Sequence, residues 1–147
     1  MERALVVVEA TEATKNLVAE AAELAHGVGA ELRLLYVTSD EEFEERQGEL
    51  SSIPGINLDY GVAKGVEEAE GFAQAVGEDV LGEDGEFTAV GRIGESEEEI
   101  LAEARSSNAD HIFVHGRQRS PAGKAVFGDL AQAIILGFDG PVTVTTS

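Results

Sequence analysis

Short apolar segments alternate along this chain with segments whose apolar residues recur every three or four positions, and this alternation limits the fold more than any other feature. The run RALVVV at 3–8 is rich in β-branched residues and is typical of a buried strand. The segment 14–26 repeats its apolar residues at helical spacing. Further strands are predicted at 31–37, 86–90, 111–116 and 141–145, and further helices at 66–81, from 96 onward and at 128–136.

Parallel strands are the natural result when each strand is followed by one helix, because the helix returns the chain to the same edge of the sheet. We therefore predict an α/β fold, a doubly wound five-stranded parallel sheet with helices on both faces, within one domain at 1–147. Ser96 and Glu99 fit a capping box at the start of one helix. Residues 38–64, which include an acidic run and the Pro54-Gly55 turn signal, are expected to form a surface excursion with some helix.

The charge balance excludes several kinds of partner. Asp and Glu number 29 against 10 Lys and Arg, a net charge of −19, so nucleic acid and anionic membranes are poor partners. The charge indicates either a halophilic protein in a saline cytoplasm or an acidic surface with no environmental meaning. The absence of cysteine excludes disulfides, thiolate metal sites and a cysteine nucleophile. No secretory signal pattern or membrane-length apolar run is found, so we expect a cytoplasmic protein.

One loop reverses the acidic character of the chain. Between His111 and Gly128 there is no acidic residue, and the loop holds several glycines whose backbone can approach a ligand closely. Together with the start of the following helix, this composition predicts an anion cradle, most readily for phosphate. A basic loop that pairs with neighbouring acids is the structural alternative. The basic residues concerned are Arg117, Arg119 and Lys124.

Neither common nucleotide fingerprint is present. The glycine spacing in this loop differs from that of a Walker A motif, and Ala125 stands where Ser or Thr would hold magnesium. No Gly-x-Gly-x-x-Gly pattern follows the first strand. In open parallel sheets, ligands bind beyond the carboxyl ends of the strands, so three loops remain candidates. They are 9–12, 38–40 and 115–128.

Three stretches of this sequence, VVVEATEAT, AVGRIGESEEEILAEARSSNADHIFVHGRQRS and GDLAQAIILGFDGPVTVT, cover much of the chain. Together they resemble the universal stress protein family over nearly the whole length. The resemblance implies a sheet in the strand order 3-2-1-4-5, of the adenine nucleotide alpha hydrolase-like kind. It also implies a homodimer paired through the last strand, here Val142 and Val144, and in one branch of the family an ATP site.

That ATP site, carried over by the resemblance, lies in the loops after strands one, two and four. Glu9 and the backbone at Ala10 would meet the adenine end, and Val37 would offer backbone contacts to adenine. The ribose and phosphate loop would begin at His115 and Gly116. The remaining phosphate-loop positions are Arg119, Gly128, Asp129 and Leu130. Apart from the resemblance, the charges of Arg117 and Lys124 and the hydroxyl of Ser120 make them further candidate phosphate contacts.

This sequence departs from the family pattern at several of these positions. Glu9 replaces the usual aspartate, and Ala10-Thr11 replaces a small Gly-Ser pair. Arg119 replaces the second glycine of the loop, which is one residue shorter. Asp129 replaces the final hydroxyl residue and would either help hold magnesium or cap the last helix.

Three functional hypotheses follow. The first is a stress-associated regulatory protein that binds ATP with Mg²⁺, or a related nucleotide, and is not an enzyme beyond slow hydrolysis. The second is a dimeric interaction protein of the same fold that has lost nucleotide binding. The third, an enzyme that transfers adenylyl groups, lacks the serine- and glycine-rich loop that such chemistry uses after the first strand. His115 would be a general base in an enzyme, but a lone histidine at a strand end more often packs or donates a hydrogen bond.

Overall fold

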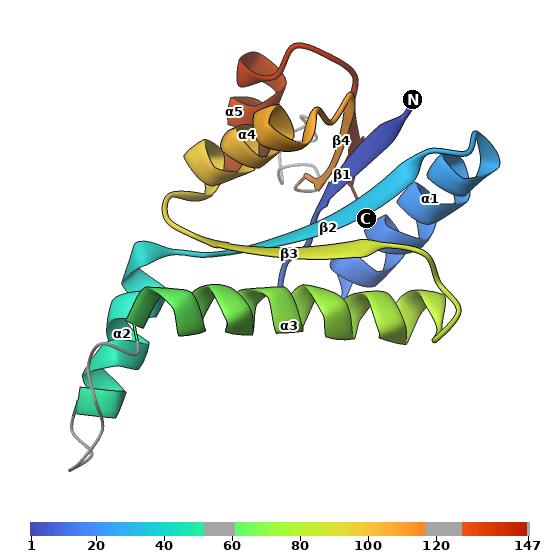
Figure 1. Cartoon of the computed structure of the whole chain (residues 1–147). Coiled ribbons are helices and arrows are strands. Elements are labelled where there is room, and N and C mark those ends of the chain that lie inside the picture. Colours follow the sequence, from blue (N-terminus) through green and yellow to red (C-terminus); the bar gives the residue numbers. More distant parts are fainter. Residues whose placement is uncertain (52–60, 117–127, 147) are drawn as a thin grey trace.

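A parallel five-stranded sheet in the order β3-β2-β1-β4-β5 organises the molecule (Figure 1), which confirms the predicted fold class and strand order. The computed structural model describes residues 1–51, 61–116 and 128–146. The strands are β1 (Arg3–Val7), β2 (Glu31–Thr38), β3 (Thr88–Ile93), β4 (His111–His115) and β5 (Val142–Thr145). The helices are α1 (Ala13–Gly27), α2 (Asp40–Ser51), α3 (Gly61–Leu81), α4 (Ser96–Ser107) and α5 (Asp129–Gly137).

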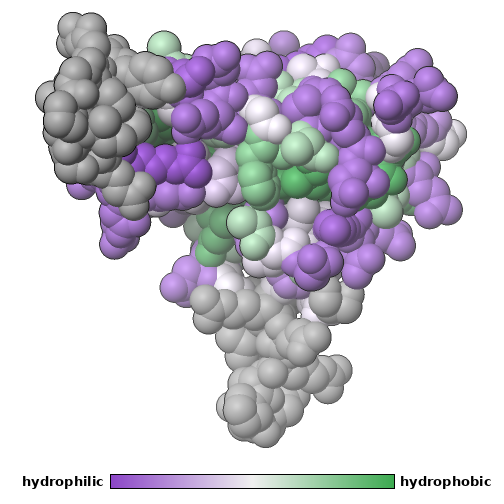
Figure 2. All heavy atoms as spheres, turned by 90° about the horizontal axis from the view of Figure 1, so that it is seen from below, coloured by the Kyte–Doolittle hydropathy of each residue, from purple (hydrophilic) through white to green (hydrophobic). Residues whose placement is uncertain are grey.

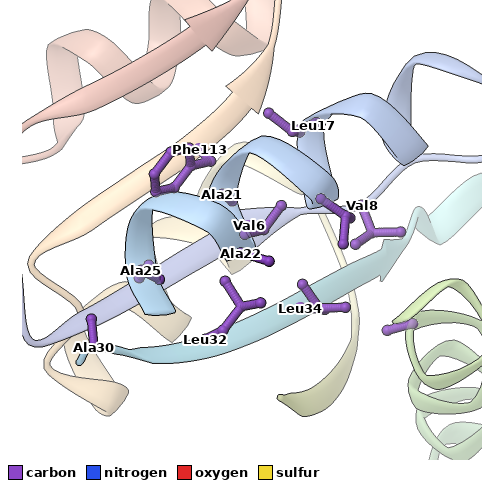
Figure 3. Close-up of a cluster of buried hydrophobic side chains, with 13 residues drawn as sticks. Val6, Val8, Leu17, Ala21, Ala22, Ala25, Ala30, Leu32, Leu34 and Phe113 are labelled. Atoms are coloured by element: carbon purple, nitrogen blue, oxygen red, sulfur yellow. The ribbon is translucent and has the colours of Figure 1, made fainter. Parts of the chain in front are cut away.

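Helices cover both faces of the sheet, with α1 and α3 on one face and α4 and α5 on the other (Figure 1). On the first face, Val6 and Leu34 pack against Leu17 and Ala21 of α1 (Figure 3). On the second face, Leu5 belongs to a cluster that holds buried residues of α4 and α5. Because successive strand residues point to opposite faces, a central strand buried on both sides must be apolar, as residues 4–8 are.

Asp110, in the turn before β4, fixes the beginning of β1. Its carboxylate accepts the backbone N–H groups of Glu2 at 2.8 Å and Arg3 at 3.2 Å. The hydrogen bond from the Glu2 backbone is the main reason that the pKa of Asp110 lies below its usual value. Arg3 pairs in turn with Glu31 at the start of β2, with 2.5 Å between Nε and Oε2. This short polar chain holds the amino ends of β4, β1 and β2 in register.

The predicted capping box is wrong. The N-cap residue of α4 is Glu95, Ser96 is the first helical residue, and no side chain caps the helix. Glu99 turns instead toward the sheet, where its Oε1 lies 3.2 Å from Nη1 of Arg92. Arg92, which only the folded sheet brings close, therefore binds the carboxylate that the local sequence pattern assigned to the cap.

Element boundaries differ from the prediction where distant residues decide them. The excursion after β2 contains α2, whose acidic first turn suits the positive end of the helix dipole. Helix α3 begins at Gly61 rather than at residue 66, and Phe43 of α2 packs so closely on Gly65 that a Cβ there would lie 2.9 Å from its ring. Strand β3 runs over 88–93 rather than 86–90. The Pro54-Gly55 turn signal lies outside the described residues.

One face of the molecule is largely polar. Hydrophilic residues cover most of the face seen from below the sheet, and hydrophobic residues gather in a band across its middle (Figure 2). Large apolar side chains that are exposed include Leu24, Val28, Val62 and Leu136. Among the described residues, no helix has the length and apolar character needed to cross a membrane.

Candidate functional site

The three loops predicted to form the site leave the sheet at the same level of its carboxyl edge. Val7 lies opposite Leu35 in the β1–β2 ladder, so Glu9 and Val37 both follow two residues later. Val6 lies opposite Phe113 in the β1–β4 ladder, so Glu9 and Gly116 both follow three residues later. The chain order reverses between β1 and β4, the position where ligands of doubly wound sheets bind.

The backbone after β1 is held in place by hydrogen bonds. The N–H of Val8 donates to the carbonyl oxygen of Leu35 at 2.8 Å, which continues the ladder beyond the strand. The N–H of Glu9 donates to Oγ1 of Thr14 at 2.7 Å, and Thr14 is only 2% exposed. The half-buried Glu9 and the exposed Ala10 therefore sit on a fixed backbone at the mouth of the β1–β4 junction.

The end of β2 presents backbone rather than side chain. The Val37 side chain packs against the apolar cluster under α4 and α5, as backbone recognition of a base would require. The next residue, Thr38, is 5% exposed and accepts the N–H of Gly94 at 3.0 Å. Gly94 has a φ of +149°, and a Cβ there would lie 2.9 Å from the Glu99 side chain, so only glycine fits this link between the ends of β2 and β3.

The end of β4 is tied to β5. The N–H of the buried Gly116 donates to the carbonyl oxygen of Thr145 at 2.6 Å. Nδ1 of the half-buried His115 lies 3.2 Å from Oγ1 of the same threonine. The first residues of the predicted phosphate loop thus start from a fixed position, and the hydrogen bond to Thr145 supports the structural interpretation of His115.

His111, at the other end of β4, has a structural environment. Its Nε2 lies 2.7 Å from Oγ1 of Thr143, and its ring stacks on Phe113 with 4.5 Å between the ring centres. Burial of the imidazole lowers the pKa of His111, since it disfavours the charged form. These contacts give His111 a structural role in the sheet.

The prediction that Asp129 caps the last helix is wrong. The N-cap residue of α5 is Gly128, whose extended φ and ψ of −63° and 158° place Asp129 as the first helical residue. Asp129 is exposed, whereas Leu130 packs against the apolar cluster of the second face. A first-turn carboxylate still interacts favourably with the helix dipole without a capping hydrogen bond. Within the described residues, no group of three or more His, Asp or Glu side chains could hold a metal ion.

Four predicted phosphate contacts lie outside the described residues: Arg117, Arg119, Ser120 and Lys124. The described part of the predicted site is therefore the base end and the two ends of the predicted phosphate loop. Sequence reasoning missed Thr14 and Thr145, which hold the backbone of Glu9 and Gly116. Thr14 lies close enough in sequence to suggest an interaction with the loop after β1, but Thr145 gives no local signal because it acts across the sheet.

Comparison with known proteins identifies the family. The model of the universal stress protein family matches residues 1–146, so the chain belongs to this family. A search of curated protein sequences returned no match.

Solved structures of the family share the fold. The universal stress protein UspA from Lactobacillus plantarum is 18% identical with a TM-score of 0.69, and the match covers 98% of this chain and 97% of that one. A universal stress protein from Archaeoglobus fulgidus in complex with dAMP is 17% identical with a TM-score of 0.53 and coverage of 98% and 97%. A universal stress protein in complex with cAMP is 12% identical with a TM-score of 0.56 and coverage of 99% and 96%.

Proposed function

We propose that this chain is a nucleotide-binding regulatory protein of the stress response, which binds ATP with Mg²⁺, or a related adenine nucleotide, at the carboxyl edge of the sheet. The observation that carries the proposal is the common level of Glu9, Val37 and Gly116 at the β1–β4 junction. A base would lie against the backbone after β1 and β2, and the phosphates would extend toward the loop after β4. The complexes of family members with dAMP and cAMP support an adenine nucleotide as the ligand.

The protein would act by binding rather than by catalysis. His115 is held by Thr145, and no carboxylate among the described residues orients it as a general base would require. Any hydrolysis of the nucleotide should therefore be slow. We place the protein in the cytoplasm, where high salt would screen its net charge of −19.

Nucleotide binding should raise the melting temperature. With magnesium-ATP at about 100 times its dissociation constant, the protein should gain about 2.7 kcal/mol, because a ligand that binds only the folded state stabilises it by mass action. The measurement is thermal unfolding in about 1 M KCl, which screens nonspecific attraction. AMP, dAMP and cAMP are compared in the same buffer.

A charge-reversal double variant and a charge-reversal control locate the site. Arg117→Glu combined with Arg119→Glu should abolish the shift, because a phosphate would then face two carboxylates. Arg105→Glu is the control, since Arg105 is exposed in the last turn of α4, at the opposite edge of the sheet. A shift that survives in the double variant would place the phosphates elsewhere, and no shift with any nucleotide would favour the second candidate function.

The second candidate function, a dimeric interaction protein, is favoured by the edge position of β5. Pro141 and Thr145 accept hydrogen bonds from β4 and from the residue that follows it, so the alternate residues Val142 and Val144 direct their backbone groups to the open edge. Their side chains pack inward against the second-face cluster. Pairing with a second copy through the backbone of Val142 and Val144 would satisfy these groups, and such a dimer is compatible with nucleotide binding.

The dimer should be detected by light scattering at micromolar concentration in high salt. Val144→Pro should convert it to a monomer, because proline removes an outward N–H and is tolerated on an edge strand. Circular dichroism checks that the variant remains folded. A wild-type monomer, or a folded Val144→Pro protein that stays dimeric, would contradict pairing through β5.

A further inference from the structure

A cavity lies at the amino edge of the sheet, opposite the edge that carries the candidate nucleotide site. It has a volume of about 550 Å³ and lies between the end of α1, the start of β2 and the connection from α3 to β3. In Figure 1 this is the end of the sheet where α1 turns into β2. Its apolar wall comes from Leu32 and from the half-buried Phe87, whose ring is pressed against Gly77 of α3.

The polar groups of this cavity favour a positive charge. Glu31 and Glu86 both line it, and no Lys or Arg does so among the described residues. The carboxylate of Glu31 is paired with Arg3. The carboxylate of Glu86 has no ion-pair partner within the described part of the chain. One negative charge beside an aromatic ring is the environment that an organic cation requires.

The end of α1 adds to this field. His26, in its last turn, lines the cavity, and its Nε2 donates to the backbone carbonyl of Glu86 at 3.1 Å. The carbonyl end of a helix carries partial negative charge, which stabilises a nearby cation. A side chain at Gly29 would extend into open space, so glycine leaves room for a ligand there.

We propose that this cavity binds a small organic cation, a primary amine or guanidinium group on a short apolar body. The charged group would bind to Glu86, and the hydroxyl of Thr88 would accept one of its hydrogen bonds. The apolar body would lie on the half-buried Phe87. The two ligand sites are then at opposite edges of one sheet and differ in the sign of the charge that they bind.

The test uses butylammonium chloride as the probe and butan-1-ol as its neutral counterpart, in about 1 M KCl to screen general attraction to an acidic protein. Amide chemical shifts report the binding, and those of Gly29 and Gly85 should move to saturation with butylammonium but not with the alcohol. Glu86→Gln should weaken the affinity about tenfold, because it replaces a charged acceptor by a neutral one.

Glu83→Gln is the matched control, since Glu83 is an exposed acid in the same connection that does not line the cavity. Its affinity for butylammonium should equal that of the wild type. Equal losses in the two variants, or shifts that never saturate, would show that the amine follows the overall charge and would overturn the proposal. Neither outcome bears on nucleotide binding, because the probe carries no phosphate or base.

Discussion

Replacing Gly91 by alanine is expected to destabilise the protein by about 3 kcal/mol, the upper end of the usual cost of overpacking. Gly91 is the buried position where β3 touches α3 directly. An added Cβ would overlap the backbone N of Glu70 and the backbone O of Val66, and would lie 2.8 Å from Cβ of Ala69. Backbone atoms in the middle of a helix cannot turn aside as a side chain can, so the helix and the strand would have to separate.

The control is Gly71→Ala in α3, the helix that packs on Gly91. Gly71 is exposed and a Cβ there meets nothing within 4 Å, so alanine should stabilise the protein by about 0.5 to 1 kcal/mol through helix propensity. Urea unfolding at constant high salt measures both free energies of unfolding. A Gly91→Ala protein as stable as the wild type would show that α3 does not pack on β3 as described.

Glu103→Gln is expected to cost about 3 kcal/mol, because it leaves two arginines around a buried position without their shared counter-charge. Glu103 is 5% exposed on α4. Its Oε1 lies 2.9 Å from Nε of Arg92, and its Oε2 lies 3.3 Å from Nη2 of Arg33. Burial disfavours the charged guanidinium of Arg92, but its hydrogen bonds to Glu103 and Glu99 outweigh this effect and raise its pKa.

Two further variants separate the ion-pair effect from a general charge effect. Glu98→Gln removes an exposed carboxylate from the first turn of the same helix and should change stability by less than about 1 kcal/mol. Adding Arg33→Met to Glu103→Gln should recover part of the loss, since the buried Nε of Arg33 has no hydrogen-bond partner to lose. Equal losses for Glu103→Gln and Glu98→Gln in urea unfolding would contradict this account.

The sequence predicted the elements whose residues are apolar for reasons of burial alone. Strands β1 and β4 are buried on both faces, so each appears in the sequence as a continuous apolar run. Helix α1 has one apolar side, so its apolar residues recur at helical spacing. Strand β3 was misplaced because its limits are set by tertiary contacts. Just before β3, the ring of Phe87 packs on Gly77 of α3. Just after β3, the positive φ of Gly94 ends the extended conformation.

Local rules also failed where a distant partner competed for a side chain. Ser96 and Glu99 have the spacing of a capping box, but Arg92 on β3 binds Glu99 across the sheet surface. The candidate site shows the same division. The loops 9–12, 38–40 and 115–128 could be predicted to lie together because parallel strands end at one edge, whereas Glu9, Val37 and Gly116 were chosen through the family resemblance. The support of Gly116 by Thr145 depends on a contact that only the fold creates.

The most direct test of nucleotide binding at the β1–β4 junction is an amide chemical-shift titration with magnesium-ATP. The account predicts saturable shifts at Glu9, Val37 and Gly116, which stand at one level of the carboxyl edge. Gly29 and Gly85, at the opposite edge, should not move. Shifts confined to the amino edge, or no saturable shift at the carboxyl edge in high salt, would contradict it.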